Sequence, residues 1–274
     1  MEKTWPISPE EILKMDSPFF EIQAWWGSTK HLGGRKATDE LLKLCHISGK
    51  GTLLDVGCGV GSTACYAVRK YNCRAVGVDI NSRMVERAKE RAKREGVETA
   101  VEFEVANVLN LPYPDNTFDV VIAESVLTFV KKKKEAIKEM VRVTKPSGYV
   151  GINEAYWVGR PAPEAVLTYF SQSLGDEAEL LQPDEWTNYL ESEGLQDIII
   201  EENRFRSGLH EYMEILRQTG AKNIPPALAR FCYAYLRYSS FRKYISELFR
   251  SIPTAFFESI GYGIYVGKKE RSRF

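Results

Sequence analysis

The sequence has 274 residues, enough for one large domain or for a core with a smaller cap. Lys plus Arg and Asp plus Glu each total 37, so the chain has no net charge that would attract nucleic acid or an anionic membrane. These values favour a small-molecule partner over RNA, and no apolar run approaches the length of a membrane span.

Five cysteines are spread along the chain without a CxxC pair or a recognisable zinc spacing, so no metal site is predicted. Their odd number also argues against the disulfide framework of a small secreted protein. The N-terminus lacks the charged-then-apolar pattern of a signal peptide. The sequence therefore predicts a cytoplasmic protein.

The first predicted segment is an aromatic-rich arm over residues 1–34. Ser8 to Glu11 form a capping box with proline at the first helical position, which predicts a short helix through Met15. Trp25 and Trp26 follow, and then His31 to Gly34 precede a helix predicted over 35–44. An arm so rich in aromatic residues is expected to cover part of the molecule. The structural alternative to a binding role is that its rings pack on the core and that His31 lies at the surface.

The chain is organised around a glycine-rich turn that follows a short apolar run. Residues 53–56 are typical of a strand buried on both faces, and helical periodicity begins at Ser62. Glycines in the turn let the backbone bend sharply and let another molecule approach closely. We expect this turn to bind a ligand through Asp55, Gly57, Cys58, Gly59 and Gly61.

The spacing of these glycines is GxGxG. A dinucleotide fingerprint, GxGxxG, would need its third glycine at position 62, which is Ser62. A second acid, Asp79, closes the next apolar run over residues 75–80. A carboxylate there could accept hydrogen bonds from the two hydroxyls of a ribose that lies over the turn.

The acid before the first glycine, the GxGxG spacing and the second acid together resemble the class I S-adenosylmethionine-dependent methyltransferases. The resemblance implies that Asp79 binds the ribose of S-adenosylmethionine, with Ile80 and Met84 beside it. It also implies an α/β fold, with a Rossmann-like, seven-stranded, mostly parallel sheet and helices on both faces. An ordinary tight turn is the alternative for the glycines taken alone.

The regular alternation of strand and helix after Thr52 points separately to a parallel sheet with helices on both faces. A helix is predicted over 82–95 with its charged side chains on a solvated face. The basic run from Lys131 to Lys134 is interpreted as a solvated turn. Further strands are predicted over 101–106, 120–123 and 149–153.

Side chains at the carboxyl ends of these strands form the candidate site. Asn107, with Val108 beside it, follows the third strand, where the family commonly has an Asp that binds the adenine amino group; an amide oxygen can still accept that bond. Glu124 and Ser125 follow the fourth strand, where the resemblance places the reactive methyl group. A carboxylate there could hold a cation, and a helix-entry acid is the structural alternative.

Three residues are candidates for a base that removes a proton from the acceptor: Glu124, Glu154 and His31. Methyl transfer is an in-line displacement, so orienting the reactants and excluding water matter most, and a base is optional. The loop ending in Gly33 resembles a loop of small-molecule methyltransferases that folds over the methionine end of the cofactor. This resemblance implies that Gly33 contacts the cofactor and that Trp25 or Trp26 helps to close the pocket.

The resemblance covers residues 28–154 and then weakens. We expect a core over 35–158, a helical insert over 159–195, last core strands over 196–206 and 260–269, and a helical, aromatic-rich cap insert over 207–259. The simplest interpretation of the cap is a small core of its own, but a cap over the strand ends must also line the acceptor pocket. The residues assigned to the substrate are Trp25, Trp26, Tyr156, Trp157, Tyr235 and Tyr238.

The sequence thus predicts a methyltransferase that uses S-adenosylmethionine to methylate a small-molecule acceptor at nitrogen, oxygen or carbon. An NAD(P)-dependent oxidoreductase and a cofactor-binding protein without catalysis are the alternatives. Ser62 argues against the first, and the intact turn with Asp79 argues against the second. The identity of the acceptor and the formation of a homodimer are left open.

Overall fold

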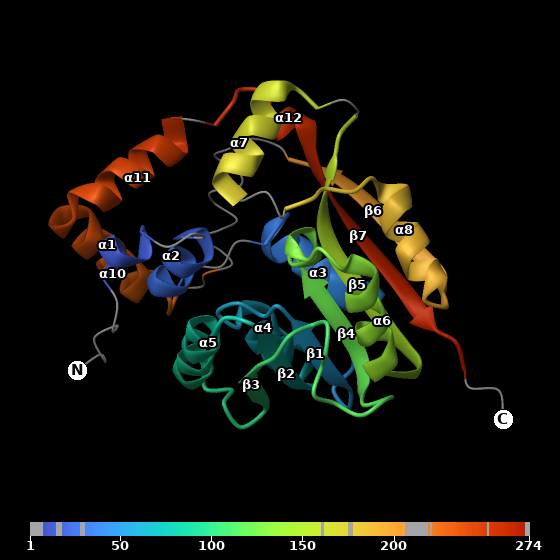
Figure 1. Ribbon diagram of the computed structural model, residues 1–274. Coiled ribbons are helices and arrows are strands. Elements are labelled where there is room, and N and C mark those ends of the chain that lie inside the picture. Colours follow the sequence, from blue (N-terminus) through green and yellow to red (C-terminus); the bar gives the residue numbers. More distant parts are fainter. Residues whose placement is uncertain are drawn as a thin grey trace.

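The computed structural model describes residues 8–14, 18–27, 31–159, 162–174, 178–205, 219, 221–250 and 252–271. Its centre is a seven-stranded sheet in the order β3-β2-β1-β4-β5-β7-β6 (Figure 1). The parallel strands are β1 (Thr52–Val56), β2 (Arg74–Asp79), β3 (Val101–Val105), β4 (Phe118–Glu124) and β5 (Thr144–Trp157). β7 (Ile260–Lys269) runs antiparallel between β5 and β6 (Leu195–Arg204), which confirms the predicted mostly parallel sheet.

Helices cover both faces of the sheet because alternate side chains of each strand point to opposite sides. In β1, Leu53 packs into one apolar cluster and Leu54 into the other, and both side chains are fully buried. One cluster includes α3 (Gly34–Leu44), α4 (Ser62–Tyr71) and α5 (Ser82–Glu95). The other includes η1 (Leu127–Phe129), α6 (Lys133–Val143) and α8 (Pro183–Ser192).

β5 is longer than the predicted strand over 149–153. Its antiparallel partner β7 follows it from Tyr149 to Trp157, so hydrogen bonds continue beyond the residues that pair with β4. A partner from the far end of the chain is not visible in the local pattern. In the structure β6 and β7 pair directly, and α10 to α12 lie between them in sequence.

The cap is built from both ends of the chain (Figure 1). Near the N-terminus are α1 (Pro9–Ile12) and α2 (Pro18–Trp26), and in the insert are α10 (Ile224–Arg237) and α11 (Ser239–Arg250). They share an apolar cluster that contains Ile12, Ile22, Trp25, Ala234 and Phe241. The capping box of α1 is present, since Ser8 and Glu11 exchange hydrogen bonds; Met15 lies outside the described residues.

A second part of the cap lies over the ends of β5 and β7. It consists of α7 (Glu164–Leu174) and α12 (Phe256–Ser259). Phe170 of α7 and Ile260 of β7 belong to one apolar cluster, with Leu32 and Trp157 packed against it. The apolar residues of this cluster therefore join the N-terminal loop to the end of the sheet.

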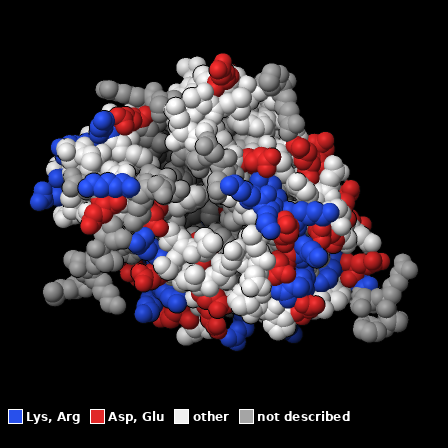
Figure 2. Space-filling view, in the orientation of Figure 1, with Lys and Arg blue, Asp and Glu red and all other residues white. Residues whose placement is uncertain are grey.

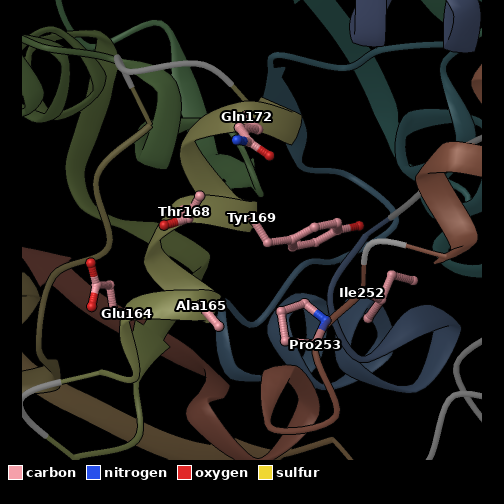
Figure 3. Close-up of a pocket in the computed structure, with 7 residues that line it drawn as sticks. All are labelled: Glu164, Ala165, Thr168, Tyr169, Gln172, Ile252 and Pro253. Carbon is pink, nitrogen blue, oxygen red and sulfur yellow. The ribbon is translucent and has the colours of Figure 1, made fainter.

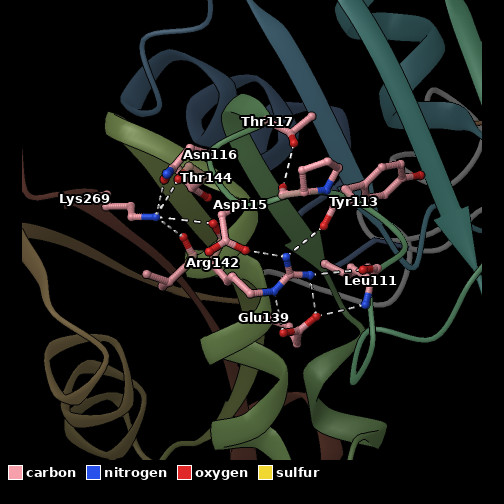
Figure 4. Close-up of polar contacts among 11 residues, drawn as sticks. Leu111, Tyr113, Asp115, Asn116, Thr117, Glu139, Arg142, Thr144 and Lys269 are labelled. Atoms are coloured by element: carbon pink, nitrogen blue, oxygen red, sulfur yellow. Dashed lines mark hydrogen bonds and ion pairs between the residues drawn. The ribbon is translucent and has the colours of Figure 1, made fainter. Parts of the chain in front are cut away.

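Arg142 and Lys269 bind several segments near the amino ends of the parallel strands, at the edge of the sheet away from the glycine turn (Figure 4). Arg142 of α6 donates hydrogen bonds to Glu139, to Asp115 and to main-chain carbonyls of the loop before β4. Lys269 at the end of β7 donates to Asn116 and to carbonyls near the end of α6, and burial lowers the pKa of this lysine. These contacts hold the edge that lies away from the glycine turn.

Two predictions about charged residues were wrong at particular positions. Arg87 and Arg91 of α5 are buried, with 8% and 2% of their surface exposed, so the charged face of this helix is only partly solvated. Lys133, in the predicted solvated run, is also buried and donates to the carbonyl of Val130 and to Glu179. Each of these cations has partners from segments distant in sequence, which a local pattern does not reveal.

The face shown in Figure 2 carries acidic and basic side chains in mixed clusters, in keeping with the equal totals of the two signs. Among the described residues, no helix is both long and apolar enough to cross a membrane.

Candidate functional site

The glycine turn holds three residues with positive φ: 66° at Gly57, 50° at Gly59 and 74° at Gly61. A Cβ at Gly57 would meet Val126 at 2.3 Å, and one at Gly61 would meet Phe103 at 2.7 Å, so these two glycines are needed for packing. A Cβ at Gly59 would meet no atom within 4 Å. Gly59 therefore faces open space, where a ligand could approach the backbone.

Asp55 and Cys58 are buried residues that bind the main chain on either side of the turn. Asp55 Oδ2 accepts a hydrogen bond from the amide of Ala64 at 3.2 Å, in the first turn of α4. Burial, together with the charge of Glu124, raises the pKa of Asp55 well above its usual value. Cys58 is buried, its amide donates to the carbonyl of Val78 at 2.9 Å, and burial raises the pKa of its thiol.

Asp79 joins the end of β2 to the turn. Its Oδ2 accepts a hydrogen bond from the amide of Gly59 at 2.9 Å, and its Oδ1 accepts one from the amide of Asn81 at 2.9 Å. Burial raises the pKa of Asp79 although both amides favour the ionised carboxylate. Next to it, the side chain of Ile80 is 71% exposed and that of Val105 is 54% exposed. The edge therefore presents an oriented carboxylate beside apolar surface.

The other residues assigned to the cofactor lie around this edge. Met84 is buried against Ala24 of α2 and Val60 of the turn. Asn107 is exposed, and its Oδ1 accepts a hydrogen bond from the amide of Leu109 at 3.0 Å. An amide oxygen has a second lone pair, so this contact still permits another donor. Val108 is buried in the core below.

Glu124 is a buried carboxylate, with 3% of its surface exposed, held by side chains from three other elements. Thr63 of α4 donates to its Oε1 at 2.7 Å, and Thr38 of α3 donates to its Oε2 at 2.9 Å. Asn153 of β5 lies 3.5 Å from Oε2 through its amide nitrogen. Its position is thus set by donors that converge on the carboxyl end of β4.

His31 completes this cluster. Its Nδ1 lies 3.2 Å from Thr63 Oγ1 and 3.6 Å from Glu124 Oε1. Because the only hydrogen of the threonine hydroxyl is directed to Glu124, the hydrogen-bond network assigns a hydrogen to Nδ1 and the ring lone pair to Nε2. Burial lowers the pKa of His31 more than the nearby Glu124 raises it, so the imidazole is neutral at pH 7.

The loop before α3 is fixed onto the ends of β4 and β5. The amide of Leu32 donates to Ser125 Oγ at 3.2 Å, and Asn153 Nδ2 donates to the carbonyl of Leu32 at 2.9 Å. Gly33 has a φ of 69°, and a Cβ there would meet the ring of Tyr262 at 2.3 Å. Ser125 itself has a φ of 58°, an unusual value for a residue with a side chain.

Glu154 points away from this cluster. Its carboxylate accepts hydrogen bonds from the amides of Val126, Leu127 and Thr128 and from the hydroxyl of Thr128, at 2.7 to 3.2 Å. Burial raises its pKa against the effect of these donors. Glu154 therefore binds the main chain at the start of η1. The side chain of the neighbouring Asn153 instead contacts Glu124 and the carbonyl of Leu32.

The residues assigned to the substrate do not converge on one point. Trp25 and Tyr238 pack in the cap cluster around Phe241, and the side chain of Trp26 lies outside the described part of the chain. Tyr235 is 43% exposed and stacks on Phe231.

The two substrate candidates on β5 differ in position. The hydroxyl of Tyr156 donates to the carbonyl of Asn203 at 3.3 Å, so this side chain lies against β6. Trp157 packs on Phe170, its ring centre 5.5 Å away, in the cluster that also contacts Leu32. Trp157 is therefore the predicted substrate residue that shares a cluster with the loop before α3.

An open depression of about 630 Å³ lies on the cap between α7 and the segment before α12 (Figure 3). It is lined by Glu164, Ala165, Thr168, Tyr169, Gln172, Ile252 and Pro253. Tyr169 extends across the space toward Ile252 and Pro253, whereas Glu164 points away from it. The glycine turn contributes no residue to this depression.

Sequence reasoning missed several side chains of the site. Thr38 and Thr63 lie in or near the first turns of α3 and α4, and helix starts beside a glycine turn are places where hydroxyls face a ligand edge. Arg35 donates to Ser62 Oγ at 3.3 Å, with its guanidinium 4.0 Å from the ring centre of Tyr66. Asn153 could have been inferred from strand alternation, because it must face the side opposite to Glu154.

Comparison with known proteins shows that part of the chain is similar to methyltransferases. Residues 54–152 match a family described as "Methyltransferase domain". Norajmaline N-methyltransferase of Rauvolfia serpentina is 33% identical over 169 residues, which are 58% of this chain and 53% of that protein. The chain spans 53%, 66% and 43% of the lengths of the first three curated relatives that it matches.

Two solved structures share the fold at low sequence identity. Phosphoethanolamine N-methyltransferase 2 of Haemonchus contortus, solved with S-adenosylhomocysteine, has a TM-score of 0.72 at 18% identity, over 97% of this chain and 61% of that chain. The [4+2]-cyclase SpnF has a TM-score of 0.66 at 19% identity, over 97% and 98% of the two chains. The match to the methyltransferase domain over residues 54–152, the sheet order, the GxGxG turn and the Asp79 contact together support a class I S-adenosylmethionine-dependent methyltransferase, and the solved structures show the shared fold.

Proposed function

We propose that the protein transfers a methyl group from S-adenosylmethionine to a small-molecule nucleophile. The observation that carries the proposal is the hydrogen bond from the Gly59 amide to Asp79, beside the exposed side chain of Ile80. A carboxylate held in this way is oriented for ribose hydroxyls, and the apolar surface next to it suits a flat ring. Open space at Gly59 leaves room for the ligand.

The residues present fit this cofactor. Asp79 would hold the ribose, Ile80 and Asn107 the adenine, and Gly33 with the loop before α3 the methionine end. Arg35, beside Ser62 at the start of α4, would bind the cofactor's carboxylate, because helix starts and guanidinium groups both attract anions. Burial raises the pKa of Asp55, and the negative charges of Glu124 and Asp79 raise it further; a positively charged ligand would be attracted by these two carboxylates.

When bound, the cofactor supplies a methyl group on a positively charged sulfur. The contribution of this chain is to align the acceptor with that group and to exclude water. The loop at Leu32 is already fastened to Ser125 and Asn153, so it supports a closed site with few adjustments. The cap helices supply the remaining cover.

A proton acceptor is available if the nucleophile needs one. His31 is neutral, and the Thr63 contact assigns its lone pair to Nε2, so we propose this nitrogen as the base for a hydroxyl or an acidic carbon. Glu124 then keeps the ring tautomer fixed through Thr63. A neutral amine would need only alignment. The contacts of Glu154 support a structural role for that residue instead.

The acceptor is proposed to be a small molecule, but its class stays open among nitrogen, oxygen and carbon nucleophiles. The relatives include proteins named as N-methyltransferases and one named for methylation of 27-O-demethylrifamycin SV. Because a cyclase shares the fold, transfer has to be measured directly.

The test is to incubate the protein with metabolite extracts and S-adenosylmethionine that carries a deuterated methyl group, and to search by mass for labelled products. A labelled product that disappears with Glu124→Gln or His31→Asn supports both the transfer and the base. Cofactor binding without any labelled product would support a binding protein without catalysis.

A cytosolic location is proposed because all five cysteines are free thiols, four of them buried. Association into a homodimer stays a prediction, which light scattering would test.

A further inference from the structure

Arg91 of α5 lies at the junction of the glycine turn and the cap. Its guanidinium is buried, with 2% of the residue exposed. Nε donates to the carbonyl of Val60, between Gly59 and Gly61, at 2.9 Å. Nη1 donates to the carbonyl of Thr219, in the insert that carries the cap helices, at 3.1 Å. One buried cation thus binds main-chain oxygens of both segments.

Glu95 extends this contact to the start of α10. Its Oε1 lies 3.1 Å from Arg91 Nη1 and accepts a hydrogen bond from Asn223 Nδ2 at 2.9 Å. Asn223 Oδ1 in turn accepts one from Arg94 Nε at 2.9 Å. On its outer side, Glu95 pairs with Arg69 of α4 at 3.2 Å. Asn223, the residue before α10, and Val60 of the glycine turn are therefore both hydrogen-bonded to side chains of α5.

A buried guanidinium is sensitive to the loss of any acceptor. It has five N–H donors, and a donor left unpaired away from water is strongly unfavourable. If Val60 moved, Arg91 would lose Nε's partner and would have to shift, which would disturb its bonds to Thr219 and Glu95. The positions of the turn and of the cap are coupled because both supply oxygens to one side chain.

We propose that Arg91 is a positioning residue: a ligand that fixes the glycine turn also fixes the start of α10, through Arg91, Glu95 and Asn223. This goes beyond the proposed transfer reaction, since it concerns how the two halves of the site are brought into register. It requires only that the turn binds a ligand. Arg91 itself touches neither reactant.

The test measures amide hydrogen exchange of α10, residues 224–237, with and without saturating S-adenosylhomocysteine. In the wild-type protein the ligand should slow exchange by about fivefold or more, the lower end of ordinary coupling between sites. Arg91→Met keeps an apolar side chain of similar length but removes the N–H donors. Asn223→Ala removes the hydrogen bonds that join Glu95 and Arg94 of α5 to the residue before α10. The side chain of Asn223 makes no capping hydrogen bond with α10, and its carbonyl, which accepts the amide of Ala227, is kept in Asn223→Ala.

In both variants the slowing of α10 exchange should fall to less than about twofold, outside the usual range of coupling. Arg69→Met is the matched control, because it removes a half-exposed partner of the same Glu95 and should keep the wild-type response. Asn223→Ala decides the question even if Arg91→Met fails to fold. A wild-type response in Asn223→Ala, or no slowing in the wild-type protein that binds the ligand, would overturn the proposal.

Discussion

The carboxylate of Asp79 is bonded to the amide of Gly59, with Oδ2 2.9 Å from the nitrogen. The two residues belong to successive strand-turn units, and their contact sets the distance between the acid of β2 and the glycine that faces open space. The same carboxylate binds the amide of Asn81, whose side chain donates to Glu21 of α2 at 2.8 Å. The end of β2 and the N-terminal arm are therefore connected through Asn81.

Gly59→Ala should weaken binding of S-adenosylmethionine by at least about tenfold, or 1.4 kcal/mol, because the new methyl group occupies the ligand's space. The positive φ would also cost about 1–2 kcal/mol of stability. Gly96→Ala is the matched control: its φ is 71°, no atom lies within 4 Å of its Cβ position, and it ends α5 away from the turn. Equal donor affinity in the two variants, measured by calorimetry, would argue against a ligand at Gly59.

Asp79→Ala should weaken donor binding by about 1.5–3 kcal/mol, the value of hydrogen bonds to a charged group. Asp79→Asn retains one oxygen acceptor and should lose less. Both proteins should still fold, which thermal unfolding would verify. A dissociation constant that is unchanged in Asp79→Ala would remove this residue from the ribose site.

Thr63→Val should lower the free energy of unfolding by about 1–3 kcal/mol, because the buried Glu124 loses a hydroxyl donor. The control is Thr117→Val, whose hydroxyl donates to the carbonyl of Pro114 at an exposed position. Urea unfolding of the two variants provides the comparison. A loss no larger in Thr63→Val than in Thr117→Val would show that Glu124 does not depend on this donor.

His31 should make stability depend on pH. Its pKa is lowered in the folded protein, so between that value and about 6.5 the unfolded chain binds more protons and the free energy of unfolding rises with pH. This contribution is present above about pH 6.5 and is lost as the pH falls through the window. Wild-type protein should therefore lose more stability than His31→Asn between pH 7 and pH 5, by urea titration.

The raised pKa values of Asp79 and Glu154 act in the opposite direction, but both residues are present in both proteins. The difference between wild type and His31→Asn isolates the histidine. Parallel pH profiles for the two proteins would contradict a buried neutral imidazole.

Tyr238→Ala should reduce the stability of the cap by about 2 kcal/mol, less than the 3–5 kcal/mol of a fully buried aromatic residue, because Tyr238 packs only partly against the cap cluster. Tyr235→Ala, at a more exposed ring, should change stability less. Melting temperatures with and without donor give the measurement. If Tyr235→Ala alone raised the Michaelis constant of an acceptor, Tyr235 would face the substrate.

The strand–turn–helix core could be predicted because its signals are local. The apolar run at 53–56, the glycine spacing and the charged helix over 82–95 each depend on neighbouring residues, and α5 begins and ends where predicted. The full length of β5 could not be predicted, because it depends on pairing with β7 more than a hundred residues later.

The polar residues of the site were harder to predict than its glycines. Thr38, Thr63 and Asn153 come from three elements and share only the carboxylate of Glu124. Arg91 was expected to be solvated because helix periodicity places it among charged residues, and only the packed cap explains its burial. Strand alternation could have placed Asn153 opposite Glu154, but its contact with Glu124 and the burial of Arg91 depend on tertiary packing.

The most direct test of this account is calorimetric titration of the folded wild-type protein with S-adenosylmethionine, S-adenosylhomocysteine and NAD. The account predicts that the first two bind with dissociation constants in the micromolar range common for metabolic sites, that Asp79→Ala weakens both, and that NAD does not bind. Binding of NAD, or failure of both S-adenosyl compounds to bind folded protein, would contradict it.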